Sequence, residues 1–422
     1  MRHGHELAGR EAMDDTRLML MRSALRRVRA TTLLTAMAVV LVGCGDAFDR
    51  HPQNILQPEG PNARTISNLH NPVFAIAGVV FVVILGACLF IAVRFRARSD
   101  ADADEYPKQM HGAFKAEITW TIIPALILAA VAVPTVFTIF TLNAEAEPDA
   151  VKVEVIGQQW WWEYRYDLDG DGKYDEITTA NDLVIPAGRD IALSITSRDV
   201  IHSFWVPRLN GKRDAVPNRD HFWRIEADKP GEYVGQCTEY CGLSHAEMRI
   251  KAIALTPAKF EAWAAAQQEK ASTFEEADTS MAAEGYRLFN QQLCSSCHLI
   301  DGVNNTKLGP DGLIKDRNLQ VSRHAPELTH LVSRTIFAGG KFDLRRDTAA
   351  CRTLGVEWAS TPANLSLCLN RPALEAWLRN PPAEKPMAAD PVPGRTGGRG
   401  MPNLNLDETQ IDQLVAYLET LK

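Results

Sequence analysis

Apolar residues are unevenly spread along the 422-residue chain, and the longest apolar runs fall in its first third. One run covers 72–93 (PVFAIAGVVFVVILGACLFIAV) and a second covers 118–142 (ITWTIIPALILAAVAVPTVFTIFTL). Each approaches or exceeds the roughly 20 residues that an α-helix needs to cross a bilayer. Buried helices of a soluble protein are the alternative, but two uncharged runs of this length disfavour it. The pattern therefore predicts a two-helix transmembrane hairpin over 72–142.

A shorter apolar run lies nearer the start of the chain. The basic stretch MRSALRRVRA is followed by TTLLTAMAVVLVG, a layout typical of an export signal and too short to span a membrane. The run ends in LVGCGD, which resembles the bacterial lipobox and implies cleavage before Cys44 and lipid attachment to its sulfur. We expect a signal peptide over 1–43 and an external segment over 44–71. A free cysteine just beyond an uncleaved anchor is the alternative.

The basic residues give the orientation of the hairpin. Five of them lie in the connection between the two apolar runs, whereas the outer flanks hold few: Arg94, Arg96, Arg98, Lys108 and Lys115. Because cytoplasmic loops are enriched in Lys and Arg, the connection is predicted to be cytoplasmic. Everything after Leu142, and a lipidated Cys44, would then lie outside a bacterial plasma membrane.

The pattern changes again after the hairpin. From about 151 to 256, short alternating apolar runs broken by turn residues predict strands of a β-sandwich or barrel, which we assign to a domain over 143–256. The segment 257–280 begins helix-like and becomes polar, and we interpret it as a linker. The part over 281–422 is helical at both ends and is predicted to be all-α. The fold class is thus a multidomain membrane protein.

Charge and cysteine content refine this picture. A formal net charge of −7 disfavours nucleic-acid binding, for which a basic face is expected. Of the eight cysteines, Cys88 falls in the first apolar run. Cys351 and Cys368 match no motif, and in an exported domain a disulfide between them is plausible.

The segment GQCTEYCGLSHAEMRI carries Cys237, Cys241, His245 and Met248 at short intervals. A disulfide would leave the histidine and the methionine without a role. Zinc suits two thiolates and an imidazole, but the thioether of methionine favours copper. A further imidazole, His202, stands upstream in RDVIHSFWVP.

The pattern C-x-E-x-C-x-x-x-H-x-x-M after V-I-H-S-F resembles the binuclear CuA centre of cytochrome c oxidase subunit II, which has a cupredoxin-like Greek-key sandwich. The resemblance implies that Cys237 and Cys241 bridge two copper ions and that His202 and His245 bind one each. Met248 would be a weak ligand to one copper and the backbone carbonyl of Glu239 a weak ligand to the other. It also implies a magnesium ion, shared with subunit I and bound by the Glu239 side chain.

Other segments resemble the same family. EITWTIIP resembles the start of its second membrane span and makes Glu117 the entrance of a proton path; a glutamate at the lipid–water boundary is the alternative. QQWWWEY resembles the aromatic patch where electrons arrive, with Trp160 in that role, although core packing is the usual role of a strand tryptophan. DAVPNR resembles the segment facing subunit I, which makes Asp214 and Arg219 interface groups.

The sequence CSSCH matches the C-x-x-C-H signature of c-type haem attachment. Cys294 and Cys297 would form thioethers to the haem and His298 would bind the iron. The preceding helix and the following LGP resemble class I cytochrome c, in which Pro310 would pack near the histidine ring.

The sixth iron ligand is predicted to be Met401, in the glycine-rich loop GGRGMPNL before the last helix. Met387 is the alternative, and His324 and His330 are less favoured. Ligation by histidine and methionine raises the haem potential and suits electron transfer.

Two features remain outside this scheme. DLDGDGKYDE places Asp167, Asp169 and Asp171 at alternating positions, as in a calcium-binding loop. The twelfth position is Thr178 and not a glutamate, so a solvated hairpin turn is favoured. The segment from Gly339 to Cys368 is longer than the usual cytochrome loop, and the sequence gives it no function.

We predict an electron-transfer subunit II of a haem–copper cytochrome c oxidase with a fused haem c domain. Electrons would pass from haem c to CuA and on to subunit I, where oxygen is reduced to water and protons are pumped. The expected partners are subunit I, other oxidase subunits, membrane lipid and an upstream cytochrome or quinol–cytochrome c reductase. A CuA-type nitric oxide reductase subunit and a membrane-anchored copper and haem redox sensor are the alternatives.

Overall fold

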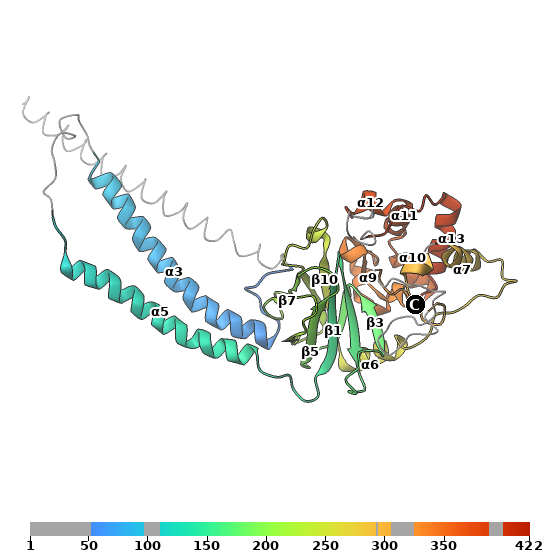
Figure 1. The fold of residues 1–422 in the computed structure, drawn as a ribbon, viewed down its shortest axis with the longest axis horizontal. Helices are drawn as coiled ribbons and strands as arrows, with labels where there is room; N and C mark the ends of the chain where they lie inside the picture. Colours follow the sequence, from blue (N-terminus) through green and yellow to red (C-terminus); the bar gives the residue numbers. More distant parts are fainter. Residues whose placement is uncertain (1–51, 97–109, 293, 305–324, 388–399) are drawn as a thin grey trace, which may run out of the picture. The chain divides into compact units, whose positions relative to one another are not determined.

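The computed structural model describes residues 52–96, 110–292, 294–304, 325–387 and 400–422 (Figure 1). Two long helices precede a β-domain and a helical C-terminal region. The predicted architecture of membrane hairpin, β-sandwich and C-terminal α-domain is confirmed.

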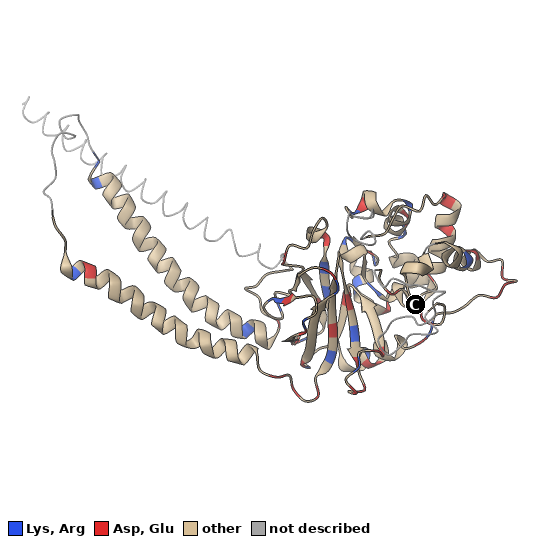
Figure 2. Ribbon diagram, in the orientation of Figure 1, with Lys and Arg blue, Asp and Glu red and all other residues tan. Residues whose placement is uncertain are grey.

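The membrane hairpin consists of α3 (Pro61–Arg94) and α5 (Phe114–Leu142), both long and apolar enough to cross a bilayer. Figure 2 shows that charged residues are confined to the ends of these helices. Helix α3 begins before the apolar run, inside the segment predicted to be external, because Pro61 suits the first helical turn. This first turn is anchored: Asn62 donates to the Arg224 carbonyl, and Arg64 pairs with Asp228.

The β-domain is a sandwich of a five-stranded sheet, in the order β3-β2-β1-β5-β8, and a three-stranded sheet, in the order β4-β10-β9. β6 and β7 form a separate two-stranded ladder. β5 alternates strictly between buried and half-buried residues, as a strand with one face on the core does. The strands are β1 (Val151–Gln158), β2 (Trp161–Asp167), β3 (Ile177–Ala180), β4 (Asp182–Pro186), β5 (Ile191–Ser197), β6 (His202–Phe204), β7 (Arg213–Ala215), β8 (His221–Ile225), β9 (Gly231–Gln236) and β10 (Arg249–Leu255).

The first half of the segment interpreted as a linker forms a helix, α6 (Pro257–Ala266). Its residues Phe260, Trp263 and Ala264 are buried in the same hydrophobic cluster as the core of the β-sandwich. The Trp263 ring meets Tyr166 edge to face at 5.4 Å. Three apolar residues at helical spacing give α6 the face with which it packs on the sandwich.

The C-terminal region is built around the pair α7 and α13, which cross closely. A Cβ added at Gly285 of α7 would collide with the Gln413 carbonyl of α13, so glycine is needed there. Phe289 and Tyr417 pack together in the core of this region, at 5.6 Å between ring centroids. Its helices are α7 (Met281–Gln291), α8 (Cys294–Cys297), α9 (Ala349–Thr353), α10 (Pro362–Cys368), α11 (Arg371–Arg379), α12 (Pro381–Glu384) and α13 (Glu408–Leu418), with short strands β11 (Ile336–Phe337) and β12 (Phe342–Asp343).

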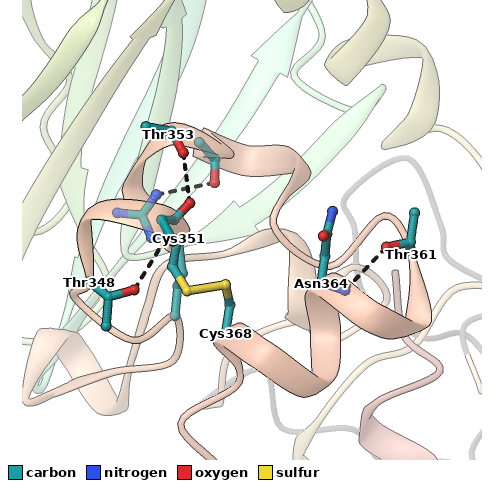
Figure 3. The surroundings of a disulfide bond; sticks show 9 residues. Thr348, Cys351, Thr353, Thr361, Asn364 and Cys368 are labelled. Atoms are coloured by element: carbon teal, nitrogen blue, oxygen red, sulfur yellow. Dashed lines mark hydrogen bonds between the residues drawn. A yellow bond between two sulfur atoms is a disulfide. The ribbon is translucent and has the colours of Figure 1, made fainter.

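Cys351 and Cys368 form a disulfide, with an S–S distance of 2.07 Å, the pairing that the sequence made plausible but left open (Figure 3). It joins α9 to the end of α10. Both helices begin with a threonine cap: Thr348 accepts from the Cys351 amide and Thr361 from the Asn364 amide. The disulfide thereby links two short helices that precede α11.

Candidate metal centre

Three strands bring together the residues of the motif that resembles a CuA centre. His202 begins β6, Cys237 follows β9, and Met248 directly precedes β10. Because β9 and β10 are antiparallel neighbours, the connection between them, 237–248, returns on itself and carries Cys241 and His245 as well. We call this connection the metal-ligand loop.

The donor atoms converge around the two sulfurs. Cys237 Sγ and Cys241 Sγ are 3.8 Å apart, and both thiols are free. A disulfide requires about 2.05 Å. Two sulfurs bound to one metal at about 2.3 Å with a tetrahedral angle lie about 3.8 Å apart, which is the spacing here. The pair is therefore arranged for metal binding.

Four further donors surround the sulfurs. His202 Nδ1 lies 3.9 Å from Cys237 Sγ, and His245 Nδ1 lies 3.5 Å from Cys241 Sγ. Met248 Sδ lies 3.9 Å from Cys241 Sγ, and the Glu239 carbonyl oxygen lies 3.3 Å from Cys237 Sγ. Six donors of this kind exceed the four that a tetrahedral zinc site uses, and the thioether is a soft ligand that suits copper.

The site is buried, and its hydrogen bonds favour a thiolate. The hydrogen bond from Cys241 lowers the pKa of the Cys237 thiol, and the same contact raises the pKa of Cys241. His202 is fully buried, and its Nε2 contacts Asp199 Oδ1 at 2.8 Å. Burial opposes a charge on His202, but Asp199 and Cys237 outweigh it and raise the pKa of the imidazole. Asp199 therefore orients Nδ1 towards the sulfurs.

Two residues that support the site were not predicted from the sequence. Asp199 stands three positions before His202 in RDVIH, and a carboxylate so close to a ligand histidine is a signal that could have identified it. The second supporting residue is Gly157 of β1, where a Cβ would lie 2.7 Å from the His202 ring. Glycine at this position makes room for the imidazole.

Trp160 lies in the turn between β1 and β2 and is 3% exposed. Its indole Nε1 donates to the Cys241 carbonyl at 3.0 Å, and the Gln159 side chain donates to the same oxygen at 2.6 Å. Trp160 is therefore in direct contact with the metal-ligand loop.

The side chains of the other residues assigned by resemblance are not among these donors. The Glu239 side chain is exposed. Glu117 is exposed in the first turn of α5, where its Oε1 accepts from the Ala113 amide at 3.0 Å and caps the helix. Asp214 lies in β7, whose residues pair with β6, and Arg219 is exposed beyond it.

The C-x-x-C-H residues lie on and after α8. Cys294 and Cys297 are free and partly buried. The His298 Nδ1 contacts the Pro326 carbonyl at 2.8 Å, and burial lowers the pKa of this imidazole. A neutral histidine anchored through Nδ1 can present Nε2 to an iron.

The remaining iron-ligand candidates differ in their surroundings. Met401 packs against the hydrophobic core of the C-terminal region, whereas Met387 packs against the core of the β-domain. His330 is buried, and its Nδ1 contacts the Lys422 carbonyl. Three of the site residues assigned from the sequence lie outside the described residues: Cys44, Pro310 and His324.

The carboxylates of the calcium-like loop come together with Glu176, and Thr178 is not among them. Asp167 accepts from the amides of Gly170 and Gly172 at 2.7 and 3.1 Å and pairs with Lys152 at 3.1 Å. These contacts are those of a hydrogen-bonded turn between β2 and β3, as favoured from the sequence.

Two family models match the chain: "Cytochrome C oxidase subunit II, transmembrane domain" over residues 51–138 and "Cytochrome C oxidase subunit II, periplasmic domain" over residues 151–255. Cytochrome c oxidase subunit 2 of Alkalihalophilus pseudofirmus is 30% identical over 397 residues, 92% of this chain and 96% of the relative. Cytochrome c oxidase subunit 2 of Bacillus sp. (strain PS3) is 31% identical over 407 residues, which cover 93% of this chain and 97% of the relative. Quinol oxidase subunit 2 of Bacillus subtilis is 32% identical over 286 residues, which cover 65% of this chain and 83% of the relative.

Proposed function

The chain belongs to the cytochrome c oxidase subunit II family, and we propose that it passes electrons from a covalent haem c in its C-terminal region to a binuclear copper centre and on to subunit I. It is a membrane protein with two transmembrane helices and a periplasmic domain that carries a CuA-type site. The observation that carries the proposal is the convergence of four further donor atoms on the free sulfurs of Cys237 and Cys241.

The residues of the site fit a copper pair. Cys237 and Cys241 would bridge the two ions, His202 and His245 would bind one each, and Met248 and the Glu239 carbonyl would complete the set. When bound, the pair would supply one-electron redox chemistry. The chain itself contributes burial, which excludes water, and the contact from Asp199 that fixes the His202 ring.

The C-terminal region fits a c-type haem. Cys294 and Cys297 are free to form thioethers, and His298 is held by the Pro326 carbonyl through Nδ1. The packing of Met401 on the core of the same region, with Met387 on the β-domain, supports Met401 as the second axial ligand. A histidine–methionine pair would give the haem a raised potential suited to a donor.

Trp160 is proposed as the residue through which electrons reach the copper centre. Its indole is bonded to the Cys241 carbonyl, while its own carbonyl accepts from Lys385 of the C-terminal region at 2.8 Å. The fused region, rather than a free cytochrome, therefore faces Trp160. An external donor would deliver electrons to the haem of this region.

The partner proposed is subunit I of a haem–copper oxidase, which would reduce oxygen and pump protons. The exposed Glu239 carboxylate is available to a magnesium ion at the boundary between the subunits. The exposed Glu117, at the start of α5, would mark the entrance of a proton path. Glu117→Gln should lower proton translocation per electron without changing copper content, which proton-release assays of reconstituted oxidase would measure. A lipid on Cys44 and a bacterial plasma-membrane location with both cofactors outside complete the proposal.

The test is to purify the oxidase from membranes with this chain and to measure oxygen uptake. Reduced cytochrome c should support turnover, and a quinol should not. Metal analysis of the same preparation should give a mixed-valence copper pair and covalent haem. Zinc in place of copper, or a single copper ion, would refute the proposal.

A further inference from the structure

Lys385 is a buried lysine, 2% exposed, at a place where the C-terminal region touches the β-domain. Lysine is almost never buried unless protein groups replace the water around its charge. The ammonium donates to the carbonyl oxygens of Trp160 and Ala338, both at 2.8 Å, and lies 3.5 Å from that of Glu247. Burial lowers the pKa of Lys385 to about 7. Three backbone carbonyls thus solvate this one group.

The three carbonyls belong to segments far apart in the sequence. Trp160 lies in the turn before β2, Ala338 begins the short 3-10 turn Ala338–Gly340, and Glu247 lies in the metal-ligand loop. The Trp160 indole is itself bonded to the Cys241 carbonyl. One ammonium therefore connects the C-terminal region to the turn that holds Trp160 and to the metal-ligand loop.

Gly339 allows the turn to approach this closely. Its φ of +73° is a backbone conformation that favours glycine. A Cβ at this position would collide with both the Trp160 carbonyl and the Lys385 ammonium. Any other residue at 339 would push the C-terminal region away from Trp160.

The residues after Lys385 continue the contact. We call Lys385–Met387 the docking segment. The Ser244 hydroxyl of the metal-ligand loop donates to the Pro386 carbonyl. Met387 packs on the β-domain core, and a Cβ added at Gly400 would collide with its side chain. Gly400 is followed at once by Met401, the proposed iron ligand.

We propose that Lys385 is a positioning residue for electron transfer between the haem-bearing region and the copper centre. It holds the docking segment and the Ala338–Gly340 turn in place, so that covalent bonds, hydrogen bonds and close contacts connect Met401 to Ser244 and Cys241. Electrons tunnel faster along such bonded routes than across gaps. The step moves one electron, oxidising the haem and reducing the copper pair, with no bond made or broken. The inference rests on the proposed function.

The test uses the full chain in detergent, loaded with haem and copper, as wild type, Lys385→Met and Lys341→Met. Methionine keeps the length of the side chain and removes the donor. Lys341 is the matched control, because it pairs with the Glu247 side chain at 2.9 Å in the same interface but is partly exposed. Ion pairs that keep contact with solvent contribute little to stability.

Two quantities are measured. Hydrogen exchange of the backbone amides reports on docking, and flash reduction of the haem reports on the rate of haem-to-copper transfer. Lys385→Met should exchange faster around Trp160 and Ala338 and transfer at least about tenfold more slowly, since small displacements of this kind are costly. The copper spectrum, the haem potential and haem reduction by an external donor should not change. Lys341→Met should match the wild type throughout.

Wild-type exchange and a wild-type transfer rate in Lys385→Met would overturn the inference. If that variant does not fold, Ser244→Ala removes only the bond to Pro386, and an unchanged transfer rate there would overturn the route. A wild-type chain in which haem and copper never exchange electrons overturns the proposed function instead, while the amide exchange of Lys385→Met still tests the docking.

Discussion

Asp182 is a buried carboxylate at the boundary between the β-domain and the C-terminal region, and its ionisation should make the stability of the protein depend on pH. It begins β4, is 2% exposed, and accepts a hydrogen bond from the Thr335 amide. Burial raises the pKa of this carboxyl from 3.8 to about 6, although Lys251 and the Thr335 contacts act in the opposite direction. We expect Asp182→Asn to remove this titration, because asparagine has no ionisable carboxyl. The substitution should keep the hydrogen bond, because the asparagine side chain retains an oxygen that can accept from the Thr335 amide.

The sign and size follow from linkage. Because the pKa of Asp182 is higher in the folded state than in the unfolded chain, the folded state holds the proton more tightly. The stabilisation is full below the unfolded pKa of about 4 and is lost as pH rises through about 6. A shift of about 2 units corresponds to about 3 kcal/mol. Between about pH 4 and pH 7 the variant should therefore gain about 3 kcal/mol relative to the wild type.

The assay is denaturant unfolding of the full chain in detergent, followed by tryptophan fluorescence at a series of pH values. Glu327 is partly buried, and desolvation raises its pKa to about 7. It titrates in both proteins and cancels in the difference when the two sites are independent. Asp343→Asn is the control, since this carboxylate lies 3.9 Å from the same Lys251 but is half exposed. Its stability difference from the wild type should change less with pH than that of Asp182→Asn. A stability difference that does not vary with pH, or that favours the wild type as pH rises, would refute the reasoning.

Three further predictions concern the cofactors and the disulfide. Cys351→Ser should lower the free energy of unfolding by about 3 kcal/mol, as expected for a loop of this length, and reductant should have the same effect on the wild type in denaturant unfolding. Met401→Leu should keep covalent haem but lower its potential in redox titration, whereas Met387→Leu should not; equal effects would contradict the assignment. Cys241→Ser should abolish the mixed-valence copper signal in electron paramagnetic resonance while haem staining persists, and a retained signal would exclude the bridging role.

The local patterns of the sequence predicted much of the fold and most of the donor set. The uncharged runs gave both membrane helices, and the alternation in β5 gave a strand with one buried face. The metal-ligand loop is short, so its spacing alone placed most of the donors together. His202 lies 35 residues before Cys237, and only the resemblance to a known family connected them.

Contacts between the β-domain and the C-terminal region could not be predicted in this way. Lys385 and Trp160 are 225 residues apart, and Asp182 and Thr335 are 153 apart. Polar contacts of this kind leave no periodic signature. Strand alternation could not place Trp160 either, because this residue lies in the turn just before β2 and not in a strand. The segment Gly339–Cys368, which the sequence left without a function, begins at the turn that meets Trp160.

The polar character of this boundary bears on why the two regions share one chain. Arg345 is buried and pairs with Glu232 at 2.6 Å, and Lys385 and Asp182 are also buried at this boundary, each in a contact between residues distant in sequence. Burying charges costs several kcal/mol each before pairing repays it. Two separate proteins would have to meet that cost together with the loss of translational and rotational freedom. Covalent attachment removes most of the second cost by raising the effective concentration. A loosely tethered region would gain the same concentration and leave these charges hydrated, so their burial favours a fixed arrangement of the β-domain and the C-terminal region over a mobile one.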